Sequence, residues 1–309
     1  PYSHIALSMD GVLYGSAFTG SSSNIEMEIT PFALAGTASV VVTGQNKQPY
    51  MGSVEVGNAD GPYVVVDDFT LMTSDGDDVV EYGETVNISM DLKNVGSEIT
   101  EDVEVSLAID DPYILMLDDT DSFGDIAPEE ISSIVNAFSF LVAAEVPDGY
   151  SFSILVTVTG SGQVWDYNLN LMAYAPVLSF GGVIVDDPDG QLDPGDSAEI
   201  GVVIHNSGGS SISAPMTIFS TSDSYITLNS SDTYTMLDIL PDSEELAYFN
   251  LTASPDTPIG HIVSFDLRII SGFIYDSTIG GSLTIGLTWE DFESGSFVTL
   301  PWNFSGNAD

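Results

Sequence analysis

Cysteine is absent from this 309-residue chain, and lysine and arginine together number only three. The absence of cysteine excludes disulfide bonds, thiol nucleophiles and thiolate metal ligands. It does not place the chain inside the cell, because domains of about 100 residues can build full hydrophobic cores without disulfides. Structural and catalytic roles for thiols and disulfides are therefore excluded, but a secreted location is not.

Positive charge is almost missing. Aspartate and glutamate number 47, the only basic residues are Lys47, Lys93 and Arg268, and the formal net charge is −44. Such a surface repels nucleic-acid backbones and anionic lipid, so we expect no nucleic-acid partner. Acidic self-repulsion is tolerated where salt or divalent ions screen it, and few basic residues leave few cleavage sites for trypsin-like proteases. Both explanations favour a secreted, extracellular location.

Long hydrophobic runs are also missing. No stretch of 18 or more apolar residues occurs, so no membrane-spanning segment is predicted. No basic-plus-apolar leader is visible, and the first residue is proline, which suggests a processed or excised piece.

Histidine is scarce, with His4, His205 and His261 as its three occurrences. No Ser-His-Asp arrangement or HExxH motif surrounds them, and the last two lie in strand-like segments, where packed histidines outnumber general bases. Paired acids carry little information in so acidic a chain. We therefore expect no enzymatic activity and no catalytic residue.

Short alternating or β-branched segments, separated by Gly, Asp, Asn and Pro, make up most of the chain. Residues 86–92, 153–158 and 264–270 are typical, and period-2 alternation at this spacing indicates antiparallel sandwich strands. Residues 129–144 are dense in apolar side chains but have strand-like neighbours, so we predict strand there and find no helical pattern. The expected fold class is all-β: tandem Ig-like β-sandwich domains in a rod-like arrangement.

An acidic turn at residues 74–84 recurs at residues 186–196. Glu81 corresponds to Asp193, which gives a spacing of 193 − 81 = 112 residues, and the same spacing relates Asn94 to Asn206. Solenoid repeats are only about 20–50 residues long, so this repeat is a duplicated domain.

The repeat divides the chain into four sections. We expect a small, possibly incomplete Ig-like domain with about five strands at 1–66, sandwich repeats at 67–174 and 175–287, and an extended segment at 288–309. The first section is small for a sandwich, whereas the last is apolar but too short to fold alone. Two explanations stay open and are compatible: a fragment cut from a longer protein, or strand donation between subunits. The candidate joint residues are Phe292, Phe297, Trp302 and Phe304.

The acidic turns are the best candidates for a metal site. Alternating carboxylates in a tight loop can direct several oxygens at one hard cation such as Ca²⁺, the possible cofactor here. The candidate ligands are Asp75, Asp77, Glu81 and Glu84 in the first copy and Asp187, Asp189, Asp193 and Asp196 in the second. An EF-hand would require helices and a glutamate at position 12, and a plain solvated turn is the alternative.

Glycosylation signals are also present. Asn87, Asn229, Asn250 and Asn303 match the N-glycosylation pattern, and Ser197 lies in a segment that resembles the O-glycosylation signal of exported Bacteroidetes proteins. We expect a surface glycoprotein on this basis.

Several segments resemble the non-catalytic part of gingipain-like secreted surface proteins of Bacteroidetes. Residues 42–50 look like the end of the Ig-like domain that follows their protease domain, and residues 292–308 resemble the opening of a MAM-like jelly roll. The two repeats, with the acidic turn and then Asn206 and Gly208, look like CARDB-type adhesion domains. The resemblance implies export through the type IX route and cell adhesion, and it supplies no active-site residue.

We expect an extracellular structural protein, a filament subunit and therefore a homopolymer, that assembles end to end by β-strand addition. The alternative is a non-catalytic adhesion or spacer region of a secreted gingipain-like cysteine protease, which would bind a carbohydrate or another cell-surface ligand.

Overall fold

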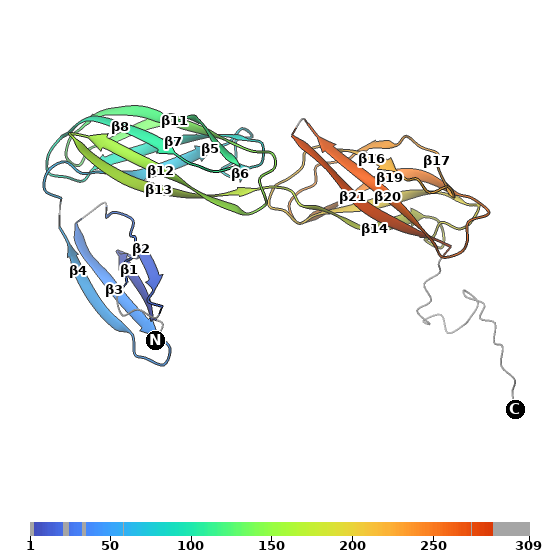
Figure 1. Cartoon of the computed structure of the whole chain (residues 1–309), viewed down its shortest axis with the longest axis horizontal. Coiled ribbons are helices and arrows are strands. Elements are labelled where there is room, and N and C mark those ends of the chain that lie inside the picture. Colours follow the sequence, from blue (N-terminus) through green and yellow to red (C-terminus); the bar gives the residue numbers. More distant parts are fainter. Residues whose placement is uncertain (1–2, 21–24, 33–34, 58, 273, 287–309) are drawn as a thin grey trace. The chain divides into compact units, whose positions relative to one another are not determined.

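The computed structural model describes residues 3–20, 25–32, 35–57, 59–272 and 274–286. These residues form antiparallel strands and no helix, which confirms the all-β prediction (Figure 1). The segment 129–144 contains strand β11 (Ile131–Val142), as predicted. No helix long and apolar enough to cross a lipid bilayer occurs among the described residues.

The chain forms two compact units. The first comprises residues 1–145 and 150–173, and the second comprises residues 146–149 and 174–309.

The N-terminal sheet contains four strands in the order β2-β1-β3-β4. They are β1 (Ser3–Met9), β2 (Val12–Phe18), β3 (Gly36–Gly44) and β4 (Tyr50–Val56). We expected about five strands before residue 67, but strand β5 (Val64–Met72) crosses that boundary and pairs with the next sheet. The buried core of the N-terminal sheet consists of Leu7, Met9 and Ala38.

Two further sheets of the first unit correspond to the first repeat. One has the order β5-β7-β11-β9, with β7 at Thr85–Asn94 and β9 at Ile114–Asp118. The other has the order β10-β8-β12-β13-β6, formed by Thr120–Ile126, Thr100–Ala108, Tyr150–Gly160, Gln163–Tyr174 and Val80–Glu81. The rings of Phe140 on β11 and Phe152 on β12 lie 5.8 Å apart, so the two sheets share a core.

The second unit repeats this arrangement. One sheet has the order β14-β15-β19-β17, formed by Leu178–Asp186, Ser197–Asn206, Ser243–Ala253 and Ile226–Leu228. The other has the order β18-β16-β20-β21, formed by Thr233–Thr235, Met216–Ser220, His261–Ser271 and Tyr275–Ile285. One cluster of buried side chains from both sheets includes Ile200, Phe249 and Leu267. This unit is therefore sandwich-like, with one core between two sheets.

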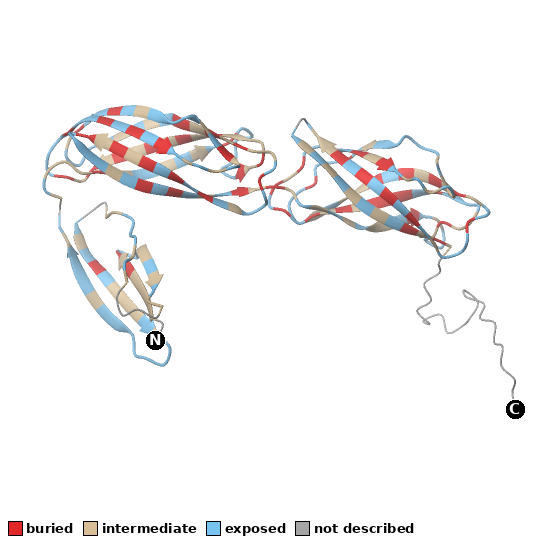
Figure 2. Cartoon of the chain, viewed as in Figure 1, coloured by how far each residue is buried: buried red, intermediate tan, exposed pale blue. Residues whose placement is uncertain are grey.

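Alternating burial explains why these segments form half-buried strands. In β7 every second side chain is buried, from Val86 to Asn94, and the bands of buried residues alternate along the strands in Figure 2. Successive strand side chains point to opposite faces, so a period-2 sequence places all its apolar groups on the core side. Burying each Val, Leu, Ile or Phe side chain contributes about 1.5–3 kcal/mol.

A buried asparagine at the end of β7 and of β15 fixes the segment that enters each sandwich. Asn206 Oδ1 accepts hydrogen bonds from the backbone N–H groups of Val177 and Gly208, both at 3.0 Å. Its Nδ2 donates to the carbonyl oxygen of Ser210 at 2.8 Å. The repeated asparagine therefore ties the incoming chain to the strand end.

The same arrangement occurs in the first copy. Asn94 Oδ1 accepts from the N–H groups of Tyr63 at 3.3 Å and Gly96 at 2.9 Å, and its Nδ2 donates to the carbonyl oxygens of Glu98 and Ile126, both at 2.8 Å. The 112-residue spacing of the two asparagines therefore corresponds to a hydrogen-bond network that occurs in both copies.

Candidate functional site

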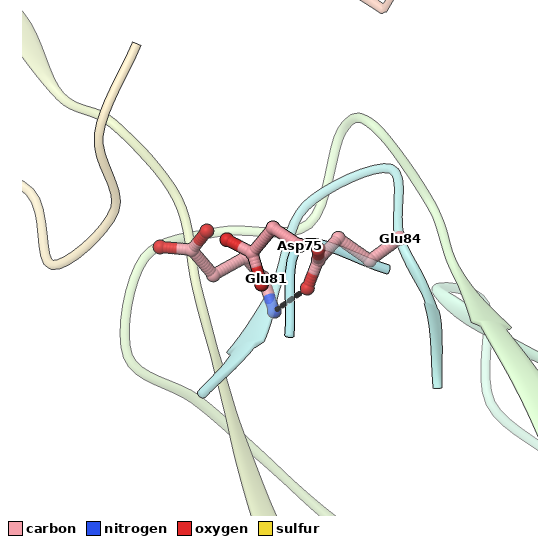
Figure 3. Close-up of side chains that lie close together, drawn as sticks. All are labelled: Asp75, Glu81 and Glu84. Carbon is pink, nitrogen blue, oxygen red and sulfur yellow. Dashed lines mark hydrogen bonds between the residues drawn. The ribbon is translucent and has the colours of Figure 1, made fainter. Parts of the chain in front are cut away.

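Three carboxylates of the first copy gather beside the turn between β5 and β7. One oxygen from each of Asp75, Glu81 and Glu84 lies within 4.8 Å of the others (Figure 3). Gly76 and Gly83 adopt positive φ angles of 89° and 71°, a conformation that glycine accepts without steric cost, and so allow the chain to bend here. The sequence prediction placed these three residues in one site, and the fold brings them together.

Hydrogen bonds hold the triad in place. Ser74 Oγ donates to Glu84 Oε1 at 2.9 Å, and the backbone N–H of Glu81 donates to Glu84 Oε2 at 3.3 Å. Thr73, which is buried, donates its hydroxyl to Asp75 Oδ1 at 2.9 Å. The carboxylates of Asp75 and Glu84 are therefore oriented by their neighbours.

The surroundings of Glu84 disfavour its ionised form. Burial raises the pKa of Glu84, the hydrogen bond from Ser74 lowers it, and the negative charge of Asp75 raises it further, for a net increase. A hard divalent cation would offset this repulsion, and carboxylate oxygens are the ligands that Ca²⁺ takes. The three carboxylates could together hold a metal ion, although exposed acidic groups are common without one.

Asp77, the fourth predicted ligand of the first copy, stands outside the triad. Its Oδ1 accepts a hydrogen bond from the backbone N–H of Val79 at 2.7 Å. Asp77 therefore stabilises the turn itself, as aspartate side chains often do two residues before a backbone donor.

The second acidic turn differs from the first. Asp187 Oδ1 accepts from the N–H of Asp189 at 3.3 Å, and Asp189 Oδ1 accepts from the N–H of Gln191 at 3.1 Å. Among the described residues, Asp187, Asp189, Asp193 and Asp196 do not form a metal-compatible group like that of the first copy. The aspartates at 193 and 196 are one methylene shorter than Glu81 and Glu84, and so reach less far across the turn.

Asp187 nevertheless has acidic neighbours. The hydrogen bond from the backbone of Asp189 lowers its pKa, but the side-chain contact with Asp189 and the charges of Asp189 and Asp196 give a net increase. The second turn thus shares the acidic character of the first without its geometry.

Three glycosylation candidates meet on one sheet. Asn229 Nδ2 donates to Asn250 Oδ1 at 2.9 Å and to Thr252 Oγ1 at 2.7 Å, and Ser197 Oγ is hydrogen-bonded to the same threonine. Asn87 is half-buried on β7. The side-chain amide nitrogen of Asn229, the atom that N-glycosylation would modify, is thus already engaged with two neighbouring side chains.

The predicted joint residues Phe292, Phe297, Trp302 and Phe304, together with Asn303, lie outside the described residues.

Sequence reasoning missed one repeated side-chain contact. In the second copy His261 Nε2 lies 2.7 Å from Asp223 Oδ2, and Asp223 Oδ1 accepts from the N–H of Tyr225 at 2.9 Å. In the first copy Tyr150 replaces the histidine and donates its hydroxyl to Asp111 Oδ2 at 2.8 Å. Asp111 and Asp223 are also 112 residues apart in the sequence, but no local signal identified their aromatic partners.

Comparisons with known proteins add little. No family model matches the chain, and no curated protein matches it in sequence. Among solved structures it is similar to the crystal structure of a protein of unknown function from Porphyromonas gingivalis W83. The two share 13% identity over 71% of this chain and 99% of the other, with a TM-score of 0.24. A likeness at this level does not indicate a shared function.

Proposed function

We propose that the chain is an extracellular structural protein, the subunit of a homopolymeric filament that assembles end to end by β-strand addition. The observation that carries this proposal is strand β4, a hydrophobic edge strand of the N-terminal sheet. We further propose that the repeats are tandem Ig-like sandwiches, of the kind found in surface proteins of the gingipain-like group.

The strand orders support the Ig-like assignment. An Ig sandwich of the constant type pairs its strands as A-B-E-D in one sheet and C-F-G in the other. The second repeat has β14-β15-β19-β17 in one sheet and β16-β20-β21 in the other, with β18 added beside β16. The first repeat has the matching orders β5-β7-β11-β9 and β8-β12-β13, with β10 added beside β8 and β6 added beside β13.

Strand β4 lies at the edge of its sheet and exposes hydrophobic side chains on both faces. The exposed fractions are 64% for Tyr50, 77% for Met51 and 51% for Val54. The strand contains no lysine or proline, the residues that most often protect an edge from pairing. An edge of this kind favours addition of a strand from another chain.

The face that such a strand would cover is identified by the register. Val54 is opposite Ala38, which is fully buried, whereas Met51 is opposite Val41 on the other face. Among the described residues of this section, the buried core cluster consists of Leu7, Met9 and Ala38, so this small core would gain most from an added apolar segment.

The proposed occupant is the segment 288–309 of a second copy, which is rich in aromatic residues. Burying Phe297, Trp302 and Phe304 would contribute about 1.5–3 kcal/mol each, and each backbone hydrogen bond about 1 kcal/mol. A joint of roughly ten residues would therefore hold two subunits firmly.

Two variants of β4 test the joint. Val54→Lys places a charge on the core face of the edge strand, whereas Met51→Lys places the same charge on the opposite face as a matched control. Negative-stain images should show filaments from the wild type and Met51→Lys, and monomers from Val54→Lys and from a chain that lacks residues 288–309. Intact filaments from the truncated chain would refute the joint. Isolated wild-type monomers would favour a spacer or adhesion region of a secreted protease instead.

A further inference from the structure

We propose that a groove in the first unit binds an extended, basic peptide segment of a partner protein, which adds as a strand to the free edge of β13. The groove has a volume of about 710 Å³, within the range of about 300–1,000 Å³ that is usual for ligand pockets. It is lined by Tyr14 and by three stretches of chain, at 28–31, 65–69 and 166–170. The second stretch lies in β5 and the third in β13, two strands of different sheets. This site is independent of the β4 joint.

Strand β13 directs alternate backbone groups into the groove. The hairpin that joins it to β12 closes with Gly160 opposite Gln163, and Ser161 and Gly162 between them have positive φ angles of 49° and 72°. A two-residue turn of this kind joins its flanking residues by a hydrogen bond, and bonded and non-bonded pairs then alternate along the ladder. The register has no shift, so within the groove the residues that direct N–H and C=O groups away from β12 are Asp166, Asn168 and Asn170.

This edge of β13 is free along the groove. β13 runs along the lower edge of the first repeat in Figure 1, and its neighbour on that side, β6, is only two residues long. Neither residue of β6 lines the groove. Residues 166–170 extend over about 14 Å, at about 3.4 Å per residue. An unpaired edge of this length is a template for a strand of about five residues from another chain.

The edge of β5 forms the facing wall. The carbonyl oxygen of Tyr63 accepts a hydrogen bond from the N–H of Val95 at 2.8 Å, so by the same alternation Val64 and Val66 direct their backbone groups away from β7. The hydroxyl of Tyr167, on β13, donates to the carbonyl oxygen of Val64. This contact joins the edges of the two sheets, and Val66 is left as a further backbone partner for an extended peptide.

The segment 28–31 forms the third wall and is held to β2. The N–H of Thr30 donates to the carbonyl oxygen of Tyr14 at 2.8 Å, and the rings of Tyr14 and Phe32 lie 4.3 Å apart. A Cβ atom on Gly15 would lie 2.9 Å from the carbonyl oxygen of Glu28, so the segment packs closely on the strand.

The second copy has no room for such a peptide. Val66 and Leu169 of the first copy correspond in register to Phe180 and Gly281 of the second. A Cβ atom on Gly281 would lie 3.0 Å from Phe180 Cε2, because the phenylalanine ring lies against the backbone of β21. The ring occupies the space beside the edge strand that valine leaves open in the first copy. The groove is therefore specific to the first copy and does not follow from the duplicated fold.

The charges on the walls select among extended peptides. No lysine or arginine lines the groove, and its acidic residues are Glu28, Asp67, Asp68 and Asp166. Charge complementarity therefore favours a segment that carries lysine or arginine. The segment 288–309 of a second copy carries Glu290, Asp291 and Glu293 and no basic residue. The occupant is therefore a segment of a different protein.

Titration of the ¹⁵N-labelled full chain with the peptide Ac-Lys-Val-Thr-Val-Lys-NH₂, followed by amide NMR shifts, tests the proposal. The largest shifts should lie at residues 164–170. The same peptide methylated at every backbone nitrogen keeps its charge but loses its donors, and it should bind at least about tenfold more weakly. Equal binding of the two peptides would overturn the proposal in favour of general attraction to an acidic surface.

Two variants at one position separate the backbone from the side chain. Asn168→Pro removes an N–H that does not bond β12, so it should weaken binding about fivefold and leave the ladder intact. Asn168→Ala keeps this N–H and should stay within about twofold of the wild type. Equal losses in the two variants would overturn strand addition. If Asn168→Pro does not fold, the methylated peptide decides the question.

The charge preference has its own test. Asp67→Asn should weaken binding of the lysine peptide about twofold to threefold and leave binding of Ac-Ser-Val-Thr-Val-Ser-NH₂ unchanged. Shifts centred on β4, or shifts at 164–170 with maltotetraose and none with either peptide, would overturn the proposal, the latter in favour of a saccharide site.

Discussion

Replacing Asn206 by alanine should strongly destabilise the second unit. The side chain is 0% exposed, and its amide oxygen is the acceptor for the N–H groups of Val177 and Gly208. The alanine variant leaves the Gly208 N–H buried without an acceptor, which costs about 1–3 kcal/mol. The loss at the half-buried Val177 N–H and at the carbonyl of Ser210 adds about 0.5–1.5 kcal/mol each. The expected loss is therefore roughly 3 kcal/mol.

Differential scanning calorimetry of the full chain measures this loss. For domains of this size, 1 kcal/mol lowers Tm by about 4–8 °C, so a loss of roughly 3 kcal/mol should lower it by roughly 12–24 °C. Asn94→Ala should produce a similar decrease in the transition of the first repeat, because its side chain makes the matching contacts. Asn229→Ala, at an exposed position with side-chain partners only, is the control and should lower Tm by only a few degrees. A decrease of less than about 3 °C in Asn206→Ala would refute the network as the fixing element.

Three further predictions concern the first acidic turn and the repeated glycine. Calcium at 100 times its Kd should stabilise the first repeat by about 2.7 kcal/mol. The Glu81→Gln variant should lose this gain. If neither calcium nor EGTA shifts the Tm of the wild type, the triad is a plain acidic turn. Because the pKa of Glu84 is raised in the fold, its ionised form costs stability at neutral pH, and the cost disappears as pH falls through that pKa. Without calcium, the Tm of the wild type minus that of Glu84→Gln should therefore increase as the pH is lowered from 7 to 4. A decrease would contradict a raised pKa of Glu84. Gly208→Ala would place a Cβ 2.2 Å from the carbonyl oxygen of Ala175. The variant should lower the free energy of unfolding in urea by about 1–3 kcal/mol or more. An unchanged urea midpoint would show that the segment around Ala175 can move aside.

Much of the fold could be predicted because strand patterning is local. The alternation in Thr85–Asn94 marks a half-buried strand before any partner is known, and the structure buries every second residue there. The segment 129–144 could be assigned as strand from its neighbours, and it contains β11. The 112-residue repeat is likewise visible in the sequence alone, since the spacing of Asn94 and Asn206 requires no coordinates.

The candidate site could be predicted only in part. The sequence grouped four acids in each turn, but side-chain length and backbone bonds decide which oxygens meet. Asp77 bonds the backbone of Val79 instead of joining Glu81 and Glu84, and the second turn has shorter aspartates. The partner of Asp223 could not be predicted either, because His261 is 38 residues away in sequence.

By itself, the sequence determined an acidic, cysteine-free chain of β-strands with one domain duplicated, because composition and period-2 alternation are properties of neighbouring residues. Tertiary structure alone decided that β5 pairs with β7 across the expected boundary, that Asn206 holds the entering chain, and that Gly201 lies beneath Tyr248. These contacts depend on strand register, and register is set by many weak interactions between segments far apart in the chain.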